Sequence, residues 1–157
     1  MKKNWIEAFG KMTYGIYVLT SFHEEQINAM IASWVSQISY DPALVMVAVH
    51  SNRYSHQLIE NSGSFALHSI SKKRTDFLSR FKGDDPGEKF VGIQWARGKT
   101  GCPVLNECIA YVECAVKAVY KPGNHTLFIG EVVDAGRLSN DDPLTTFDYQ
   151  GQYLGKD

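Results

Sequence analysis

The sequence is poor in cysteine, in net charge and in long apolar runs. Its three cysteines, Cys102, Cys108 and Cys114, follow the spacing C-x5-C-x5-C with no C-x-x-C pair, which matches neither zinc nor iron–sulfur sites. The formal net charge of −1 disfavours nucleic acid and an anionic membrane as the main partner. No apolar run approaches the ~20 residues that span a bilayer. These absences predict a protein without a cysteine-ligated metal and without a membrane span.

Motifs of several common enzyme classes are also missing. The chain has no G-x-G-x-x-G, no G-x-x-x-x-G-K-[ST], no G-x-S-x-G and no H-E-x-x-H. Dinucleotide binding by a Rossmann unit, P-loop phosphate chemistry, serine hydrolysis at a nucleophile elbow and zincin chemistry are therefore unsupported. The first ten residues include Trp5 and Glu7 and lack the apolar core of a signal peptide, which predicts a cytoplasmic location.

The composition is that of a globular protein. With 157 residues, 44% of them hydrophobic and 21% charged, the chain is expected to form a single domain over residues 1–157. Cys108 and Cys114 fall on one face of a strand pattern and are expected to be buried thiols. Cys102 precedes Pro103 in a loop with glycine nearby, and we expect it to be more exposed.

Short apolar segments separated by turn signals predict a mainly β fold. The segments follow one another as hairpin-like pairs and not as βαβ units, which favours a small, mostly antiparallel barrel. Gly63 is placed to end a helix that starts at Tyr54. The expected strands cover residues 14–20, 27–34, 44–49, 65–70, 110–120, 126–133 and 147–153, with a short one at 92–96, and the expected helices cover residues 4–9, 54–61 and 71–81.

An S-x-R-x-S stretch precedes the helix at residues 54–61. Two hydroxyls, a guanidinium and the free N–H groups of a helix start form a combination that binds phosphate, and Ser51, Arg53 and Ser55 supply it. The alternative is that a serine only caps the helix and that Arg53 is a solvated surface residue.

Polar residues interrupt the apolar pattern of residues 28–37. Ser33, Ser36 and Gln37, together with backbone groups, are suited to line the edge of a planar heteroaromatic ligand, and Trp34 is suited to stack on it. The alternative is a half-buried strand with a polar solvent face and Trp34 in the core.

His125 follows the turn at Pro122 and Gly123, where the next strand begins. A histidine at such a junction is suited to contact a ligand or to stabilise negative charge on a cofactor, or it is simply a hydrogen-bonded surface residue. None of the other histidines has a better case as a ligand contact than His125, and we expect no metal site. The other histidines are His23, His50, His56 and His68, and Asp84, Asp85 and Asp134 form no recognisable metal set with them.

Five segments in order resemble the flavin reductase-like, FMN-binding split-barrel family. They are NAMIASWVSQ at residues 28–37, DPALVMVAV at 41–49, SNRYSHQLI at 51–59, SGSFAL at 62–67 and GNHTLFIGEV at 123–132. The resemblance covers most of residues 14–135. It implies a six-stranded antiparallel split β-barrel with Greek-key-like connections that binds FMN, or FAD, as a homodimer with the flavin pocket near the subunit interface.

The resemblance also implies roles for individual residues. Residues 28 and 30–35 would lie along the isoalloxazine ring, residues 51–55 would hold the phosphate, and Lys89 would contact the flavin. His125 would face the ring or the nicotinamide side and stabilise the reduced flavin, which makes it the candidate catalytic residue. The implied cofactor-binding residues are Asn28, Met30, Ile31, Ala32, Ser33, Trp34, Val35, Ser51, Arg53, Tyr54, Ser55, Lys89 and His125.

Two parts of the chain fit the resemblance less closely. Asn124 stands where the family usually has aspartate, which removes a charge beside His125. The C-terminal segment is short, and Tyr149 or Tyr153 is the residue there that would cover the ligand.

The implied activity is that of an oxidoreductase. A hydride from NADH or NADPH would pass to flavin N5, with onward transfer of electrons. The alternative is an FMN electron-transfer module that takes electrons from a redox protein partner and has no nicotinamide site. A third reading is a barrel that has lost flavin and binds another planar ligand such as haem.

Overall fold

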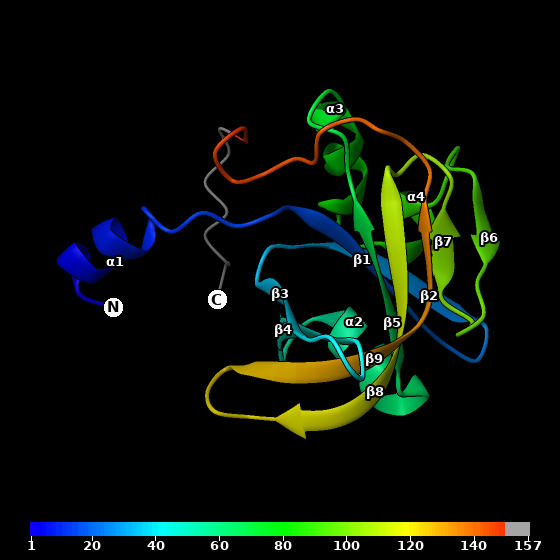
Figure 1. Cartoon of the computed structure of the whole chain (residues 1–157), viewed down its shortest axis with the longest axis horizontal. Helices are drawn as coiled ribbons and strands as arrows, with labels where there is room; N and C mark the ends of the chain where they lie inside the picture. The colour runs from blue at the N-terminus through cyan, green and yellow to red at the C-terminus, as the bar shows by residue number, and fades with distance from the viewer. Residues whose placement is uncertain (150–157) are drawn as a thin grey trace.

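A curled, seven-stranded antiparallel sheet forms the main part of the computed structural model, which describes residues 1–149 (Figure 1). Its strand order is β2-β1-β5-β8-β9-β4-β3. The predicted antiparallel, mainly β fold is confirmed, with seven strands in this sheet in place of six. The strands are β1 (Tyr17–His23), β2 (Gln26–Ala32), β3 (Val35–Ser39), β4 (Leu44–His50), β5 (Ser64–Ser69), β8 (Ala110–Tyr120) and β9 (His125–Arg137).

Two apolar cores lie on the two faces of the sheet. The core inside the curl gathers side chains from β1, β4, β5, β8 and β9, among them Leu19, Val47 and Phe128. Because side chains alternate between the faces of a strand, Val18 points the other way and packs with Phe77 and other residues of the second core. Burial on both faces explains why β1 and β5 lack a regular alternation of apolar and polar residues.

The chain changes strands at a sharp corner after Ala32, where the sequence predicted an uninterrupted strand to residue 34. Val35 N donates to Ser33 O at 3.0 Å, a tight turn that ends β2. The chain then leaves β1 and pairs with β4, with Val35 opposite Val47. The strand predicted at residues 27–34 is therefore β2, which ends at Ala32, and Ser33 and Trp34 form the corner that leads into β3 as a separate strand.

Helix α2 (Tyr54–Ser62) confirms the predicted helix and its end. Gly63 has a φ of 68°, a left-handed conformation that glycine adopts at little cost, and its N–H donates to Ile59 O at 2.8 Å. The helix buries Leu58 and Ile59 and packs against β1 and β2. It thereby presents its first turn at the ends of β2, β4 and β9.

The predicted helix at residues 71–81 is confirmed only in its second part. Only α3 (Thr75–Leu78) and the 3-10 turn η1 (Ser79–Phe81) are helical. Ser71 forms a bridge with Pro143 and donates its hydroxyl to Asp141, so tertiary contacts hold the start of this segment extended. Short elements follow: α4 (Pro86–Lys89), β6 (Trp95–Arg97) and β7 (Pro103–Leu105), of which β6 overlaps the short strand predicted at 92–96.

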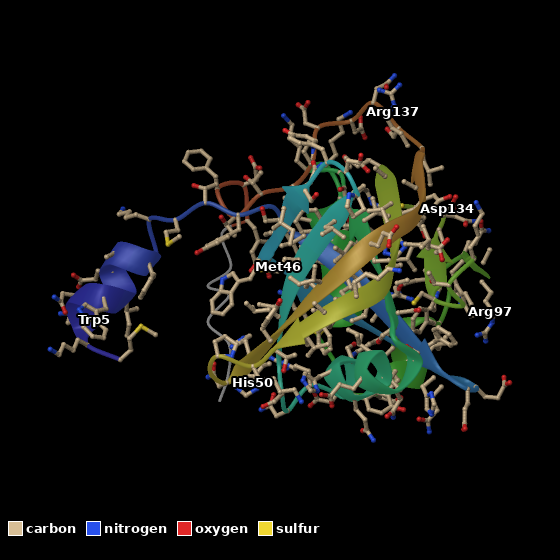
Figure 2. All side chains as sticks on the ribbon, turned by 60° about the horizontal axis from the view of Figure 1, so that its bottom comes forward. Trp5, Met46, His50, Arg97, Asp134 and Arg137 are labelled. Carbon is tan, nitrogen blue, oxygen red and sulfur yellow. The ribbon has the colours of Figure 1, made fainter. Side chains whose placement is uncertain are left out.

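Helix α1 (Lys3–Phe9) stands away from the sheet and buries none of its residues (Figures 1 and 2). Its apolar side chains Trp5, Ile6 and Phe9 are exposed. At the other end, residues 146–148 form a turn where a last strand was predicted, and the rest of that predicted strand, with Tyr153, lies outside the described residues. Among residues 1–149, no helix has the length and apolar character needed to cross a membrane.

All three cysteines are buried thiols. The burial expected for Cys108 and Cys114 is confirmed, whereas the expected exposure of Cys102 is wrong. Cys102 lies in the connection between the paired strands β6 and β7, directly before β7. Burial raises the pKa of Cys102 to about 12, so its thiol stays protonated at neutral pH.

Candidate functional site

Three of the sequence-predicted segments meet where β4 ends and β9 begins. His50 and His125 lie opposite each other in the β4–β9 register. Ser51 N donates to Asn124 O at 3.1 Å, which joins the loop after β4 to the loop before β9. Ala48 N donates to Trp34 O at 3.0 Å, so the corner after β2 lies beside the same strand. The predicted ring-binding, phosphate-binding and histidine segments are therefore neighbours.

An aromatic cluster covers this junction. The ring centroids of Trp34 and His125 are 4.6 Å apart, and those of His50 and His125 are 4.9 Å apart. Trp34 remains 47% exposed, which excludes it from the core and leaves ring surface for a planar ligand. His50 lies near the tip of the β8–β9 hairpin (Figure 2).

His125 is a neutral ring at neutral pH. Burial lowers its pKa, and electrostatic interactions with His50 and Arg53 lower it further. Its Nδ1 lies 2.8 Å from Asn124 Oδ1, and because an amide oxygen only accepts hydrogen bonds, Nδ1 carries the proton. The other ring nitrogen, Nε2, is then an unprotonated acceptor.

The first turn of α2 is electropositive. Arg53 is the N-cap residue, its backbone is extended, and no side chain caps the helix, which excludes the simple capping role for Ser51 and Ser55. The first turn contains no acidic residue, so nothing offsets the partial positive charge of its free N–H groups. Within residues 1–149, no carboxylate forms an ion pair with Arg53.

Three of the implied flavin residues form a buried hydrogen-bonded chain behind this turn. Lys89 Nζ donates to Asn28 Oδ1 at 3.0 Å, and Asn28 Nδ2 donates to Ser55 Oγ at 2.9 Å. All three side chains are buried, and Ser55 is fully inaccessible. The structure therefore brings these residues together, but it places them beneath the surface that a ligand would touch.

His56 holds the same turn from the other side. Its Nε2 lies 2.7 Å from the hydroxyl of Thr126 on β9, and its Nδ1 lies 3.5 Å from Glu60, which in turn accepts from Lys121. Burial lowers the pKa of His56, so the ring is a neutral acceptor for Thr126. The sequence gave no reason to single out His56, because its partner lies 70 positions away.

The other residues that the family resemblance assigned to flavin binding differ in how deeply they are buried. Met30 and Val35 are half-buried, whereas Ile31, Ala32 and Ser33 are buried. Tyr54 donates its hydroxyl to Gln26 at 2.6 Å and so braces the start of α2 against β2. Tyr149 packs against the second core, with Lys82 Nζ 5.1 Å from its ring centroid.

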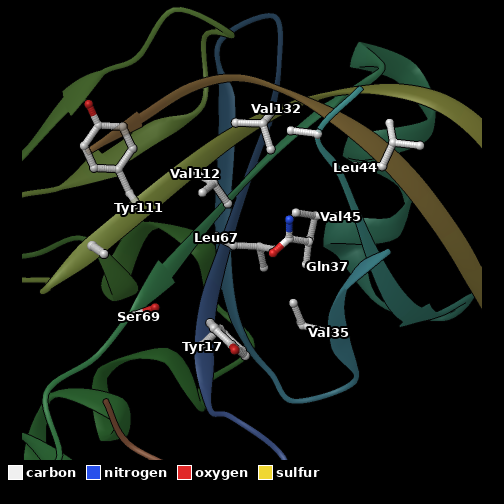
Figure 3. A pocket seen from close by; sticks show the side chains of 12 residues that line it. Tyr17, Val35, Gln37, Leu44, Val45, Leu67, Ser69, Tyr111, Val112 and Val132 are labelled. Atoms are coloured by element: carbon white, nitrogen blue, oxygen red, sulfur yellow. The ribbon is translucent and has the colours of Figure 1, made fainter. Parts of the chain in front are cut away.

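A separate cavity of about 330 Å³ opens between the two halves of the curled sheet (Figure 3). Its lining is mostly apolar, and Gln37 projects into it from β3. Of the residues that the sequence assigned to a planar ligand, Val35 and Gln37 line it. The cavity is therefore distinct from the aromatic cluster and from the first turn of α2.

A curled antiparallel barrel with an exposed aromatic cluster beside an electropositive helix start defines a class of flavin-binding barrels. Residues 9–155 match the family described as Flavin reductase like domain, and the chain belongs to this family. The resemblance drawn from the five sequence segments is thereby confirmed.

The relatives in this family include named reductases. The chain is 34% identical over 156 residues to a ferric-chelate reductase (NAD(P)H) from Archaeoglobus fulgidus, covering 96% of this chain and 92% of that protein. It is 29% identical to a high molecular weight rubredoxin from Moorella thermoacetica, covering 88% of this chain and 62% of that protein. The chain is thus an oxidoreductase with a flavin reductase-like fold.

A solved structure supports the same assignment. Nitrilotriacetate monooxygenase component B from Mycobacterium thermoresistibile superposes with a TM-score of 0.83 at 26% identity, covering 91% of this chain and 80% of that chain.

Proposed function

We propose that this protein is an FMN-dependent oxidoreductase that takes a hydride from NADH or NADPH and passes the electrons onward. One observation carries the proposal: the Trp34–His125 cluster adjoins the first turn of α2, where Arg53 has no carboxylate partner among residues 1–149. A flavin mononucleotide has the complementary parts, a planar ring at one end and a phosphate at the other. A helix start and a guanidinium are a combination that binds phosphate.

The donor set fits one terminal phosphate. The free N–H groups of α2 and the Arg53 side chain form a single anion site, and Ser51, which is exposed, lies next to it. This favours FMN over FAD, whose pyrophosphate continues into an adenosine. FAD remains the alternative ligand, and competition between the two nucleotides tests the preference.

The chain's own residues would orient the ring and balance its charge. When bound, a flavin supplies hydride acceptance from a reduced nicotinamide. Trp34 and His125 would pack on the ring and position it. Arg53, together with the start of α2, would offset the negative charge of the phosphate. His125 would not neutralise charge on the ring, because it is neutral and its Nε2 accepts but does not donate.

The test is an absorption spectrum of the purified protein, with and without added FMN, followed by anaerobic titration with NADH and NADPH. We expect flavin absorption that bleaches on addition of one of the two nucleotides. The nucleotide that bleaches it faster is the physiological donor. Failure to bind FMN or FAD at any concentration would contradict the proposal.

An electron-transfer module without a nicotinamide site is the second candidate. The similarity to a protein named high molecular weight rubredoxin favours it. Flavin that ignores both nucleotides, and that is reduced by a rubredoxin-type donor, would select this candidate over the first.

We also propose that residues 1–157 act as one domain and assemble as a homodimer. Two features support the assembly: α1 exposes its apolar side chains, and the apolar cavity opens to solvent (Figures 2 and 3). A short helix without packing partners is only marginally stable in water. An isologous contact would cover both features in each protomer.

A further inference from the structure

The side chain of Asn124 fixes the protonation of the neighbouring His125 ring. Its Oδ1 lies 2.8 Å from His125 Nδ1, and this is the only hydrogen bond of the His125 ring within residues 1–149. An amide oxygen is a neutral acceptor, so it holds a proton on Nδ1 without the negative charge that would favour a second proton on Nε2. Asn124, an exposed residue of the β8–β9 turn, therefore decides which nitrogen of His125 is free.

The groups around His125 favour the same neutral state. Burial lowers its pKa, and electrostatic interactions with His50 on β4 and with Arg53 ahead of α2 lower it further. Among residues 1–149, no carboxylate lies at ion-pair distance from the His125 ring. The amide of Asn124 thus stands where a carboxylate would stabilise an imidazolium.

The neutral ring of His125 belongs to the surface offered to a planar ligand. Its centroid lies 4.6 Å from that of Trp34, the two planes are inclined by 46°, and both side chains are partly exposed. A ligand that packs on this cluster meets an imidazole with a lone pair on Nε2 and without a positive charge. The charge state of His125 therefore acts directly on whatever binds there.

A flavin differs in charge between its two redox states. The reduced ring carries negative charge that the oxidised ring lacks, and charged groups near the ring tune the balance between the two states. An imidazolium beside the ring would bind the reduced state more tightly, because its Nε2 would carry a proton and donate it in a hydrogen bond. A neutral acceptor gives no such preference, so the equilibrium stays on the oxidised side.

We propose that Asn124 is a positioning residue that holds His125 as a neutral acceptor and thereby keeps the reduction potential of the bound flavin low. Asn124 acts through His125 and not by a ligand contact of its own. The inference rests on the proposed binding of flavin at the Trp34–His125 cluster. A low potential suits a protein that passes electrons onward, because its reduced flavin is then the stronger reductant.

The first measurement reads the His125 ring itself, by 15N NMR of the histidine side chains in the full-length protein without added flavin. We expect His125 to carry a proton on Nδ1 alone at pH 7. In Asn124→Asp we expect the pKa of His125 to rise, because the carboxylate stabilises the imidazolium. The His125 signals are identified by their absence from His125→Gln. Asn140→Asp is the matched control, because it adds the same charge at an exposed position beyond the opposite end of β9.

The second measurement is the reduction potential of the bound flavin between pH 6 and pH 9, obtained by equilibration with a reference dye. At the acidic end we expect Asn124→Asp to favour reduced over oxidised flavin about tenfold more than wild type, a rise of about 30 mV for a two-electron couple. As the pH passes the raised pKa of His125, this rise should disappear, because the ring becomes neutral beside a carboxylate. Asn140→Asp should follow wild type at every pH.

Three results would overturn the inference. One is a wild-type His125 that carries a proton on Nε2 at pH 7, which would mean that the amide does not hold the ring as an acceptor. Another is an unchanged pKa of His125 in Asn124→Asp. The last is a raised pKa without the rise in potential at acidic pH, including the case in which both redox states lose affinity equally, which indicates a purely structural role.

The two measurements separate this inference from the proposed function. If wild type binds no flavin, the proposed function fails and the inference fails with it, even where NMR shows the expected proton on Nδ1. If wild type binds flavin and Asn124→Asp has the wild-type potential throughout, flavin binding stands and only the role of Asn124 is rejected.

Discussion

Arg53 is the residue on which the proposed phosphate site depends most directly. Replacing it with alanine removes a charge-assisted contact worth about 1.5–3 kcal/mol, so we expect FMN to bind ~10- to 100-fold more weakly. Riboflavin binding should change little. Titration of both ligands checks this, with Arg137→Ala as the control, because Arg137 is exposed at the far end of β9. Equal FMN affinity in both variants would place the phosphate elsewhere.

Replacing Trp34 tests the part of the proposed site that would bind the flavin ring. Its side chain is half-exposed, so Trp34→Ala should barely change the free energy of unfolding. Loss of aromatic stacking costs about 1 kcal/mol, and we expect FMN and riboflavin to lose affinity alike, by ~5-fold. Tyr40→Ala is the control, since Tyr40 is an exposed aromatic residue in the β3–β4 turn. A loss confined to FMN would mean that Trp34 lies near the phosphate and not the ring.

His68 determines part of the pH dependence of stability. It is fully buried between Val18 O, 3.0 Å from its Nδ1, and Leu105 N, which donates to its Nε2 at 3.2 Å. Burial lowers its pKa to about 4, from an ordinary value of 6.5. The unfolded chain therefore binds more protons between these values, and stability is full above pH 6.5 and falls as the pH drops toward 4.

The size of this effect is on the order of 3 kcal/mol. Urea unfolding at pH 7, 5.5 and 4.5 measures it, and His68→Asn should flatten the decline although it lowers stability at pH 7. His23→Asn is the control, because His23 lies at the more exposed end of β1. A decline that persists in His68→Asn would assign it to another group.

At the scale of elements, the C-terminal end of α2 depends on one glycine. Gly63 has a φ of 68° and no atom near the position of an added Cβ, so the cost of a substitution lies in the backbone alone. Gly63→Ala should lower the free energy of unfolding by about 1 kcal/mol. Gly123→Ala is the control, because an added Cβ at Gly123 also has no atom nearby and Gly123 does not have a positive φ. Its denaturant unfolding should therefore match that of wild type. Similar stability of the two variants would reject the left-handed cap.

The elements predicted correctly are those whose signal is local. The runs at residues 110–120 and 44–49 became β8 and β4 with nearly the predicted bounds, because β-branched residues and flanking turns act within the segment. The helix predicted at 71–81 begins four residues late, at Thr75, because its first residues bridge to residues 141–143. The corner at 33–34 was missed because the change of pairing partner from β1 to β4 is a tertiary contact that the local sequence does not record.

At the scale of the whole molecule, the proposed homodimer makes α1 an interface element. The double variant Trp5→Ser, Phe9→Ser removes exposed apolar surface from α1, and we expect the dimer to dissociate at a higher protein concentration than wild type. Light scattering over a concentration series measures this. Val91→Ser, another exposed apolar position in the loop before β6, is the control. A monomeric mass for wild type at all concentrations would contradict the assembly.

The sequence by itself determined the strand and helix types, the glycine end of α2 and the family, because periodicity, turn residues and ordered motifs are encoded in neighbouring positions. It also singled out Trp34, Arg53 and His125, which the structure brings to one junction. Only the tertiary structure decided which of the candidate site residues are exposed and which are buried. Lys89 and Asn28, which share a hydrogen bond, are 61 positions apart in the sequence, and Ser55 is buried although it lies in the first turn of α2. Burial and hydrogen-bond direction arise from such distant contacts, and no local pattern records them.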